Sequence, residues 1–318
     1  MNDFTELVDL ASERIGGAAV AANDEFFAPK ENLVKTAKPV FLEHEYTDRG
    51  KWMDGWETRR RREPGHDWCV VRLGLPGVIR GVTVDTAFFK GNFPEACSLE
   101  AAESADGPWT EILARSPLRG DAENPFPVHA DRRSTHVKLH IYPDGGVARL
   151  RVYGLVALDP SRVQAGTEMD LAALENGGLV VAASDMFFGA RHNLILPGPP
   201  LGMHDGWETR RRRGPGHDWA VVRLSARGSI RRIEVDTTYF KGNAPGSCSV
   251  EVTETLDGDP PAPDSRWREI LPQTPLRANE LHRFEARALD LPPATHARLN
   301  IFPDGGVARL RLFGAVAG

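Results

Sequence analysis

The chain has 318 residues, of which 41% are hydrophobic and 26% charged, and its formal net charge is −5. This length favours two domains over one, because single cores seldom grow past roughly 250 to 300 residues. The acidic balance argues against a nucleic-acid partner, and no run approaches the roughly 20 apolar residues of a membrane helix, so neither nucleic acid nor a membrane is expected as a partner.

The amino terminus is acidic where a secretory signal would be basic. The three cysteines of the chain lack any metal-ligand spacing. We therefore expect a cytoplasmic protein with reduced thiols. Residues 6–16 and 170–178 could each form a short helix. Strands are predicted at 68–75, 78–89, 97–104, 136–143 and 147–156, which are rich in Val, Ile, Leu and aromatic residues. Regularly spaced short strands predict an all-β sandwich or jelly roll.

The chain also contains an internal duplication. DGWETRRRREPGHDW at 54–68 returns at 205–219, VDTAFFKGN at 84–92 returns as VDTTYFKGN at 235–243, and IYPDGGVARLRVYG at 141–154 returns as IFPDGGVARLRLFG at 301–314. These repeats predict two domains, residues 1–157 and 168–318, joined by a linker at 158–167 that contains Pro and Gly.

The repeats differ in length where residues 34–53 of the first correspond to residues 195–204 of the second, so the first is ten residues longer there. Connecting loops tolerate such insertions, because closing a longer loop costs little free energy. What stays in register is expected to be scaffold or site.

Each repeat resembles the galactose-binding-like jelly roll, through DWCVVRLG, IRGVTVDT, SLEAAESADGPWTEIL and the closing VARLRVYG. A narrower resemblance, to the allantoicase family, is carried by DGWETRRRRxPGHDW, VDTxxFKGN and PDGGVARLR in the same order in both repeats. This second resemblance covers nearly the whole chain. It implies an allantoate amidinohydrolase of purine degradation, a hydrolase that converts allantoate and water to ureidoglycolate and urea and that forms a homo-oligomer.

Allantoate carries a carboxylate and two ureido arms on one carbon, so its site needs cations, hydrogen-bonding groups, and an acid or base at the C–N bond. The candidate cations are Arg59, Arg60, Arg61 and Arg62, with Arg210, Arg211, Arg212 and Arg213 in the second repeat. In an extended segment alternate side chains face opposite ways, so at most two per repeat are expected to reach one ligand. The others would pair with acids such as Glu57 or Asp54. The alternative for such a run is a solvated edge.

Two kinds of residue could supply the acid or base. His66 and His217, each next to an aspartate (Asp67 and Asp218), have an ordinary pKa of about 6.5, although such a histidine could instead cap the Pro-Gly turn. Glu57 and Glu208 are the rival candidates, and their alternative is charge balance for the arginines.

Lys90 and Lys241 follow a strand and enter a Gly-Asn turn, where each ammonium could lean over the loop end of the sandwich. Asn92 and Asn243 are candidate contacts for the ureido groups. Arg149 and Arg309 either face the site or pair with Asp144 or Asp304.

No metal or cofactor is expected. His136 and His140 of the first repeat could suggest a pair of metal ligands, but the second repeat has Asn300 in place of His140. A set made of Glu57, His66 and Asp67 remains open, because carboxylate and imidazole suit many divalent ions.

Two other classes compete with the enzyme: a non-catalytic protein that binds a small anion or a carbohydrate, and a structural assembly module. Four arginines per repeat favour an anion over a neutral sugar. The sequence leaves open whether each repeat holds a site or both combine into one, and whether urea leaves by displacement or through an imine.

Overall fold

The computed structural model describes residues 4–157, 163–255, 259–286 and 292–318. It divides into two compact units, Met1–Ala157 and Leu158–Gly318. Part of the predicted linker, residues 158–162, lies outside the described residues. In the described ranges no helix is long and apolar enough to cross a membrane.

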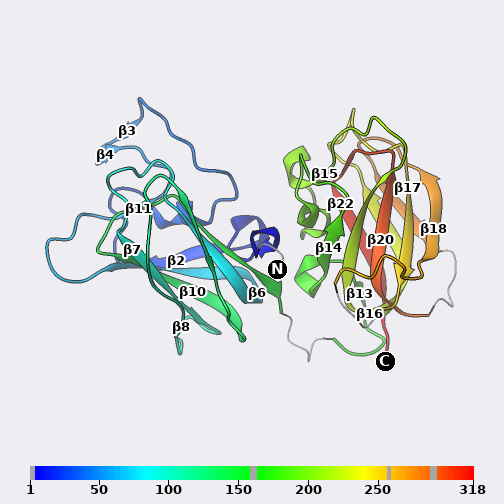
Figure 1. Ribbon diagram of the computed structural model, residues 1–318, viewed down its shortest axis with the longest axis horizontal. Helices are drawn as coiled ribbons and strands as arrows, with labels where there is room; N and C mark the ends of the chain where they lie inside the picture. Colours follow the sequence, from blue (N-terminus) through cyan, green and yellow to red (C-terminus); the bar gives the residue numbers. More distant parts are fainter. Residues whose placement is uncertain (1–3, 158–162, 256–258, 287–291) are drawn as a thin grey trace. The chain divides into compact units, whose positions relative to one another are not determined.

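The first unit is built around one central strand, β6 (Asp67–Asp85), visible in Figure 1. The hydrogen-bonded order is β1-β12-β6-β10-β7-β8, with β2 and β9 also pairing with β6. The other strands are β1 Val8–Asp9, β2 Ala18–Ala22, β7 Ala96–Ala102, β8 Thr110–Pro117, β9 Glu123–Pro127, β10 Arg133–Tyr142 and β12 Arg149–Val156.

Strand β6 links the two layers of the sandwich because different parts of it pair with different neighbours. Residues 67–72 pair with β10, whereas residues 79–85 pair with β12. Between them lies Gly74, where a Cβ would stand 2.4 Å from the carbonyl oxygen of Ile15, so the close approach of the two backbones requires glycine. The prediction of two separate strands here is wrong: the Gly- and Pro-containing stretch is internal to one long strand.

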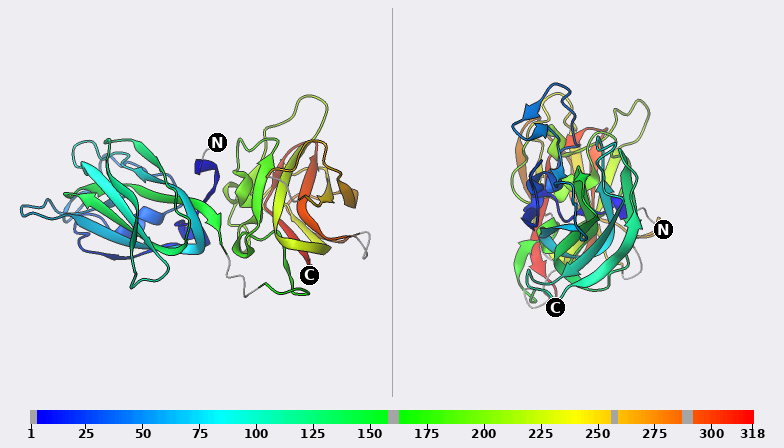
Figure 2. Two further views of the ribbon diagram at one scale, coloured as in Figure 1. Left: turned by 60° about the horizontal axis from the view of Figure 1, so that its bottom comes forward. Right: turned by 90° about the vertical axis from the view of Figure 1, so that its left-hand side faces the viewer.

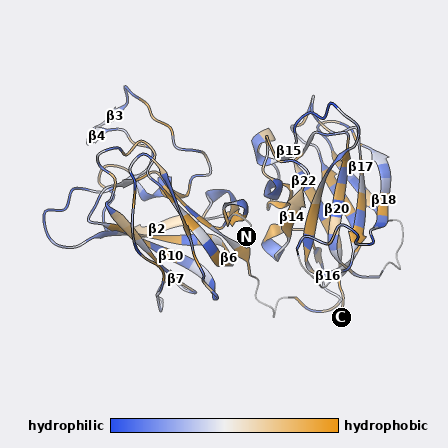
Figure 3. Ribbon diagram, viewed as in Figure 1, coloured by the Kyte–Doolittle hydropathy of each residue, from blue (hydrophilic) through white to orange (hydrophobic). Residues whose placement is uncertain are grey.

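The core lies between the layers, and alternating side chains of each strand point into it. Figure 3 shows this alternation of hydrophobic and hydrophilic residues along the strands, and Figure 2 shows the strands of the unit from further directions. The fully or almost fully buried residues of the first unit include Cys69, Val71, Leu73, Ile79, Val82, Val84, Leu99, Val137, Leu139, Ile141, Leu150 and Val152.

The second unit repeats this order as β13-β22-β16-β20-β17-β18, with β14 and β19 on β16. Its strands are β13 Glu168–Asp170, β14 Leu179–Ala183, β16 Asp218–Asp236, β17 Ser247–Thr253, β18 Arg268–Pro275, β19 Leu281–Glu285, β20 Ala294–Phe302 and β22 Arg309–Val316. The prediction of an all-β tandem duplication is confirmed.

The prediction of helices at 6–16 and 170–178 is wrong, apart from a single turn in each stretch. The structure has only the 3-10 turns η2 (Glu13–Ile15) and η5 (Leu174–Asn176) within those stretches. Val8 and Asp9 instead pair with β12, which buries Val8 and Leu10. Tertiary pairing therefore overrides a weak local helix propensity. The remaining 3-10 turns are η1 Phe4–Glu6, η3 Lys30–Val34, η6 Arg191–Ile195 and η7 Met203–Asp205.

Three two-stranded pairings lie outside the main sheets. In the first unit β5 (Trp56–Glu57) pairs with β11 (Gly146–Val147), and β15 (Trp207–Glu208) pairs with β21 (Gly306–Val307) in the second. The third, β3 (Tyr46–Thr47) with β4 (Gly50–Lys51), lies in the insertion of the first unit.

Candidate functional site

Two of the repeated motifs meet at the β5–β11 pairing. The backbone of Glu57 pairs with Gly146 on one side and with Ala28 on the other. Trp56 beside it is fully buried, and its indole Nε1 donates to the carbonyl oxygen of Asp24 at 2.8 Å. The position of Glu57 is therefore fixed by backbone bonds on both sides and by a buried neighbour.

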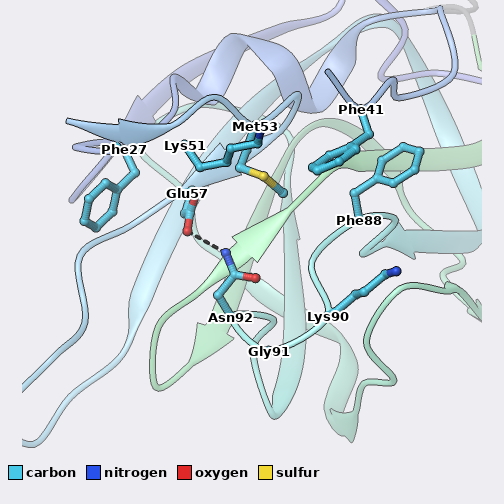
Figure 4. Close-up of a pocket in the computed structure, with 10 residues that line it drawn as sticks. Phe27, Phe41, Lys51, Met53, Glu57, Phe88, Lys90, Gly91 and Asn92 are labelled. Carbon is cyan, nitrogen blue, oxygen red and sulfur yellow. Dashed lines mark hydrogen bonds between the residues drawn. The ribbon is translucent and has the colours of Figure 1, made fainter. Parts of the chain in front are cut away.

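A pocket of about 390 Å³ opens next to Glu57 (Figure 4). The Asn92 side chain donates from Nδ2 to Glu57 Oε1 at 2.7 Å. The backbone carbonyl oxygen of Asn92 accepts from the backbone N–H of Gly146 at 2.8 Å. Burial raises the pKa of the Glu57 carboxyl, and the hydrogen bond from Asn92 offsets only part of that rise. The pocket is lined by Phe27, Phe41, Gly50, Lys51, Met53, Glu57, Phe88, Lys90, Gly91 and Asn92.

Aromatic side chains form much of the pocket wall. Phe41 and Phe88 stack with ring centroids 5.6 Å apart, as Figure 4 shows. Phe88 holds a positive φ of 69°, and its backbone N–H donates to Asp121 Oδ1 at 2.7 Å. Tyr239, its counterpart in the second repeat, has the same unusual backbone, with φ of 72°. An aromatic residue kept in this sparsely populated region in both repeats is typical of a functional loop.

Two lysines line the pocket. The Lys90 side chain is 78% exposed, and its ammonium lies 3.9 Å from Asp121 Oδ2, at the limit of an ion pair. The Lys51 ammonium lies over the rings of Phe41 and Tyr46 and donates to the carbonyl oxygens of Leu42, at 2.9 Å, and Glu43. Lys90 is thus the cation better placed to receive a carboxylate.

The arginine run lies beside this pocket, and none of its members lines it. Arg59 pairs with Asp24 at 3.1 Å, and Arg61 pairs with Asp67 at 2.7 Å. In the described part of the chain Arg60 and Arg62 are exposed and show no acidic partner. The predicted partners, Glu57 and Asp54, are wrong: Glu57 faces Asn92, and the carboxylates that pair with the run are Asp24 and, at the start of β6, Asp67.

The second repeat treats its arginines in the same way. Arg210 lies 3.7 Å from Asp185 and Arg212 pairs with Asp218, whereas Arg211 and Arg213 are exposed.

Asp54 forms a buried ion pair with Arg149, outside the arginine run. Its Oδ2 accepts from Arg149 Nη2 at 2.7 Å, and the Arg149 side chain is 1% exposed. Asp205 and Arg309 form the same buried pair in the second repeat. Arg149 and Arg309 therefore face the interior, and the expectation that they pair with Asp144 or Asp304 is wrong. The latter carboxylates instead accept from the backbone N–H groups of the arginine run, as Asp144 does from Arg61.

The structure places His66 outside the pocket. Its Nε2 hydrogen-bonds His140 Nδ1 at 2.9 Å, and His140 Nε2 hydrogen-bonds Glu100 at 2.8 Å. Burial, and then the neighbouring His140, lower the pKa of His66. The carboxylate of Asp67 bonds Asn23 and Arg61, so Asp67 does not orient the His66 ring.

In the second repeat His217 lies 3.3 Å from Asn300 Oδ1 and packs on Phe302, and Asp218 bonds Ser184 and Arg212. The histidines thus lie against a sheet strand in both repeats.

The carboxylate–amide pair recurs in the second repeat. Asn243 donates from Nδ2 to Glu208 Oε1 at 2.5 Å, and Lys241 is exposed nearby in sequence. The structure therefore brings Glu57, Asn92 and Lys90 together, and brings Glu208 and Asn243 together, out of a longer set of sequence candidates.

No metal site is built from the described residues: no group of three or more His, Cys, Asp or Glu side chains is arranged to hold an ion. The set Glu57, His66 and Asp67 that the sequence left open does not assemble, because each of the three bonds a different partner. Sequence reasoning missed the pocket residues Phe27, Phe41, Lys51 and Met53. The ten-residue length difference was the available signal for Phe41, Lys51 and Met53, and the recurrence of Phe27 as Phe188 was the signal for Phe27.

Comparisons with known proteins agree over both units. The family model described as the allantoicase repeat matches residues 8–157 and 169–317. A probable allantoicase of Pseudomonas aeruginosa is 49% identical and the alignment covers 98% of this chain and 96% of that protein. An allantoicase of Dictyostelium discoideum is 46% identical, covering 97% and 87%. The crystal structure of an allantoicase from Saccharomyces cerevisiae is similar with a TM-score of 0.80, at 36% identity, covering 97% and 93%.

Proposed function

The chain belongs to the allantoicase family, and we propose that the pocket around Glu57 is where it carries out the family's reaction. That reaction is the hydrolysis of allantoate to ureidoglycolate and urea in purine degradation, so the enzyme prediction is confirmed. The observation that supports this pocket is the 2.7 Å hydrogen bond between Asn92 and Glu57, which holds the Glu57 carboxyl at the pocket wall.

Lys90 is proposed to bind the substrate carboxylate. Its ammonium is exposed at the pocket and only weakly engaged by Asp121 at 3.9 Å, so it can accept a stronger partner. Because a carboxylate and an ammonium also attract at longer range, this cation would orient allantoate as it enters. Arg60 and Arg62, exposed beside the pocket, would add to the positive field without touching the reacting carbon.

The ureido arms are planar and carry both donors and acceptors. The side-chain amide of Asn92 donates one N–H to Glu57, and the Asn92 side-chain oxygen can accept from a ureido N–H. The faces of Phe27, Phe41 and Phe88 provide flat apolar surfaces for such planar groups. The pocket thus matches the substrate at its carboxylate, at its hydrogen-bonding groups and in its planar parts.

Glu57 is proposed as the acid and base. The reaction breaks the bond between a urea nitrogen and the central carbon, and the departing nitrogen must receive a proton. A protonated Glu57 donates that proton, and the resulting carboxylate then takes one from the water that adds to the carbon. Atoms balance as allantoate plus water gives ureidoglycolate plus urea, whether water arrives after an imine forms or in direct displacement. Burial that raises the pKa of Glu57 suits this double role.

Glu57→Gln, assayed for urea release from allantoate, tests this assignment. Removing a general acid and base should lower kcat by about 10²- to 10⁴-fold. Glu63→Gln is the matched control, since it makes the same change of charge at an exposed position of the neighbouring loop. Activity of the Glu57→Gln enzyme within threefold of the wild type would refute the role of Glu57.

We further infer a cytoplasmic homo-oligomer that binds no nucleic acid. The three cysteines are free and buried, which suits a reducing compartment, and the net charge of −5 disfavours polyanions. Oligomerisation rests on the family resemblance alone. Cell fractionation tests the compartment, sedimentation equilibrium tests the oligomeric state, and a gel-shift assay with DNA and RNA tests the absence of nucleic-acid binding.

A further inference from the structure

The two repeats present different surroundings to the same carboxylate–amide pair. In the first repeat the insertion, residues 34–53, contributes Phe41, Gly50, Lys51 and Met53 to the pocket that holds Glu57. The corresponding stretch of the second repeat is residues 195–204, ten residues shorter.

The insertion is tied down at several points. The Val40 backbone N–H donates to Asp54 Oδ2 at 3.1 Å, and Met53 packs with Phe89 and Ala148 in a buried cluster. Further along, Arg49 donates to the Phe26 carbonyl oxygen at 2.9 Å and lies over its ring. Lys51 bridges back to the carbonyl of Leu42. The insertion is therefore a built wall of the pocket, held by hydrogen bonds, ring contacts and a buried methionine.

The second repeat keeps the first of these hydrogen bonds, but its loop at 195–204 is shorter and contains no hairpin. The Leu201 backbone N–H donates to Asp205 Oδ2 at 3.0 Å, as Val40 does to Asp54, and the 3-10 turn η7 follows at once. One aromatic residue beside the pair is much more open in the second repeat: Phe188 is 62% exposed, whereas its counterpart Phe27 is half-buried. Tyr239 and Phe88 differ little, at 41% and 36% exposed. Leu201 is itself 63% exposed.

Enclosure changes what the same pair can do. Glu57 and Glu208 are both half-buried and Asn92 is more exposed than Asn243, so the difference between the repeats lies in the wall that a bound substrate would meet. Such a wall excludes water from the substrate, strengthens its charge interactions and holds it against the reacting group.

Planar ureido arms also need a flat apolar surface to lie against, and in the first repeat the stacked pair of Phe41 and Phe88 forms part of such a wall. The second repeat has Tyr239 in place of Phe88 but has no residue in sequence that corresponds to Phe41.

We propose that the insertion at 34–53 confines turnover to the first repeat, with Phe41 and Lys51 as specificity-determining residues for allantoate, while the Glu208–Asn243 pair of the second repeat does not turn over substrate. This inference rests on the function proposed for the Glu57 pocket. It answers the question, left open by the sequence, of whether two equal sites are present.

Paired variants of the full chain test the inference: Glu57→Gln against Glu208→Gln, with kcat and KM for urea release from allantoate. Glu57→Gln should lose about a hundredfold or more in kcat, and Glu208→Gln should stay within twofold. Comparable losses in both variants would overturn the inference and leave the proposed function standing. Loss only in Glu208→Gln, or in neither variant, would overturn both. Circular dichroism and melting temperatures establish that each variant is folded.

Variants of the insertion give a second, independent readout. Phe41→Ala should raise KM by about tenfold, the scale at which a pocket discriminates by apolar contact. Leu42→Ala is the matched control, because Leu42 and Phe41 are adjacent and each 45% exposed, yet only Phe41 lines the pocket. Lys51→Met should raise KM as well. Equal KM values for Phe41→Ala, Lys51→Met and Leu42→Ala would overturn the role assigned to the insertion.

Discussion

Arg149→Met is expected to destabilise the first unit strongly. The Arg149 guanidinium donates to Asp54 Oδ2 at 2.7 Å and to the carbonyl oxygens of Asp54, Ala148 and Ala37 at 2.9, 2.7 and 3.0 Å. Methionine fills a similar volume but leaves the Asp54 carboxylate and three carbonyls without this donor. Breaking a buried pair by removing one partner costs about 3–5 kcal/mol, a large fraction of the roughly 5–15 kcal/mol that stabilises a domain.

The assay is urea unfolding of the full chain, followed by circular dichroism, with thermal melting as a second measure. A cost of that size should lower the melting temperature of the affected unit by roughly 6–20 °C. Arg309→Met, which breaks the Asp205 pair, is the matched variant for the second unit. The double variant Arg149→Met/Asp54→Leu should recover part of the loss, since it removes the buried carboxylate that would otherwise keep only Lys35, at 3.3 Å, as its cation among the described residues. A loss below about 1 kcal/mol in Arg149→Met would refute the reasoning.

Three further predictions concern protonation and reactivity. Because the hydrogen bond from Asn92 lowers the pKa of Glu57 against the effect of burial, Asn92→Ala should move the Glu57 limb of the kcat/KM pH profile to higher pH; an unmoved limb would disconnect the two residues. Burial and His140 lower the pKa of His66, so the folded state should lose stability as pH falls through about 6.5. His66→Gln should remove part of that loss in melts at pH 5 and 7.5 while changing kcat/KM less than threefold, and a hundredfold loss of activity would restore the catalytic prediction for His66. Burial raises the pKa of all three thiols, to about 12 for Cys97 and Cys248, so a thiol reagent such as Ellman's should label none of them at pH 8 in the native protein and three in urea.

The sequence predicts the fold well because the duplication and the alternation of strand residues are both local signals. It fails where long-range pairing decides the outcome. Residues 6–16 contain enough helix-forming residues to predict a helix, yet Val8 and Asp9 gain more by pairing with β12. The Gly74 region, similarly, has the composition of a turn, and only the approach of the Ile15 backbone shows that glycine serves a bend within a strand.

For the site, the sequence predicts the residues that recur in both repeats and misses those that line the pocket wall. Glu57 and Asn92 are found because they recur in fixed motifs, and β5 with the turn after β6 brings them together. Phe41 and Lys51 occupy a segment without periodicity and without a counterpart, so nothing local marks them. The sequence places His66 next to Asp67, but adjacency alone does not make a pair, and the two side chains bond His140 and Arg61 respectively.

The duplication also separates scaffold from chemistry. Arg149–Asp54 and Arg309–Asp205 form the same buried pair, and Arg61–Asp67 recurs as Arg212–Asp218, so these repeated charges satisfy one another. Internal pairing explains why these paired charges recur in both repeats, since losing one partner would leave the other unpaired at a cost of about 3–5 kcal/mol where the pair is buried. It does not explain the recurrence of Arg60, Arg62, Arg211 and Arg213, which are exposed.

The partner of the motif histidine, in contrast, changes from His140 to Asn300, which a shared proton-transfer role in both repeats would not tolerate. Repetition therefore identifies residues that the fold needs, and it cannot by itself identify the repeat that works. The proposed distinction lies in the segment that is not repeated: the insertion at 34–53 lines one wall of the pocket beside Glu57, while Glu208 keeps its amide partner but lacks that wall. A duplicated enzyme can thus retain two copies of a motif for stability and use one of them for catalysis.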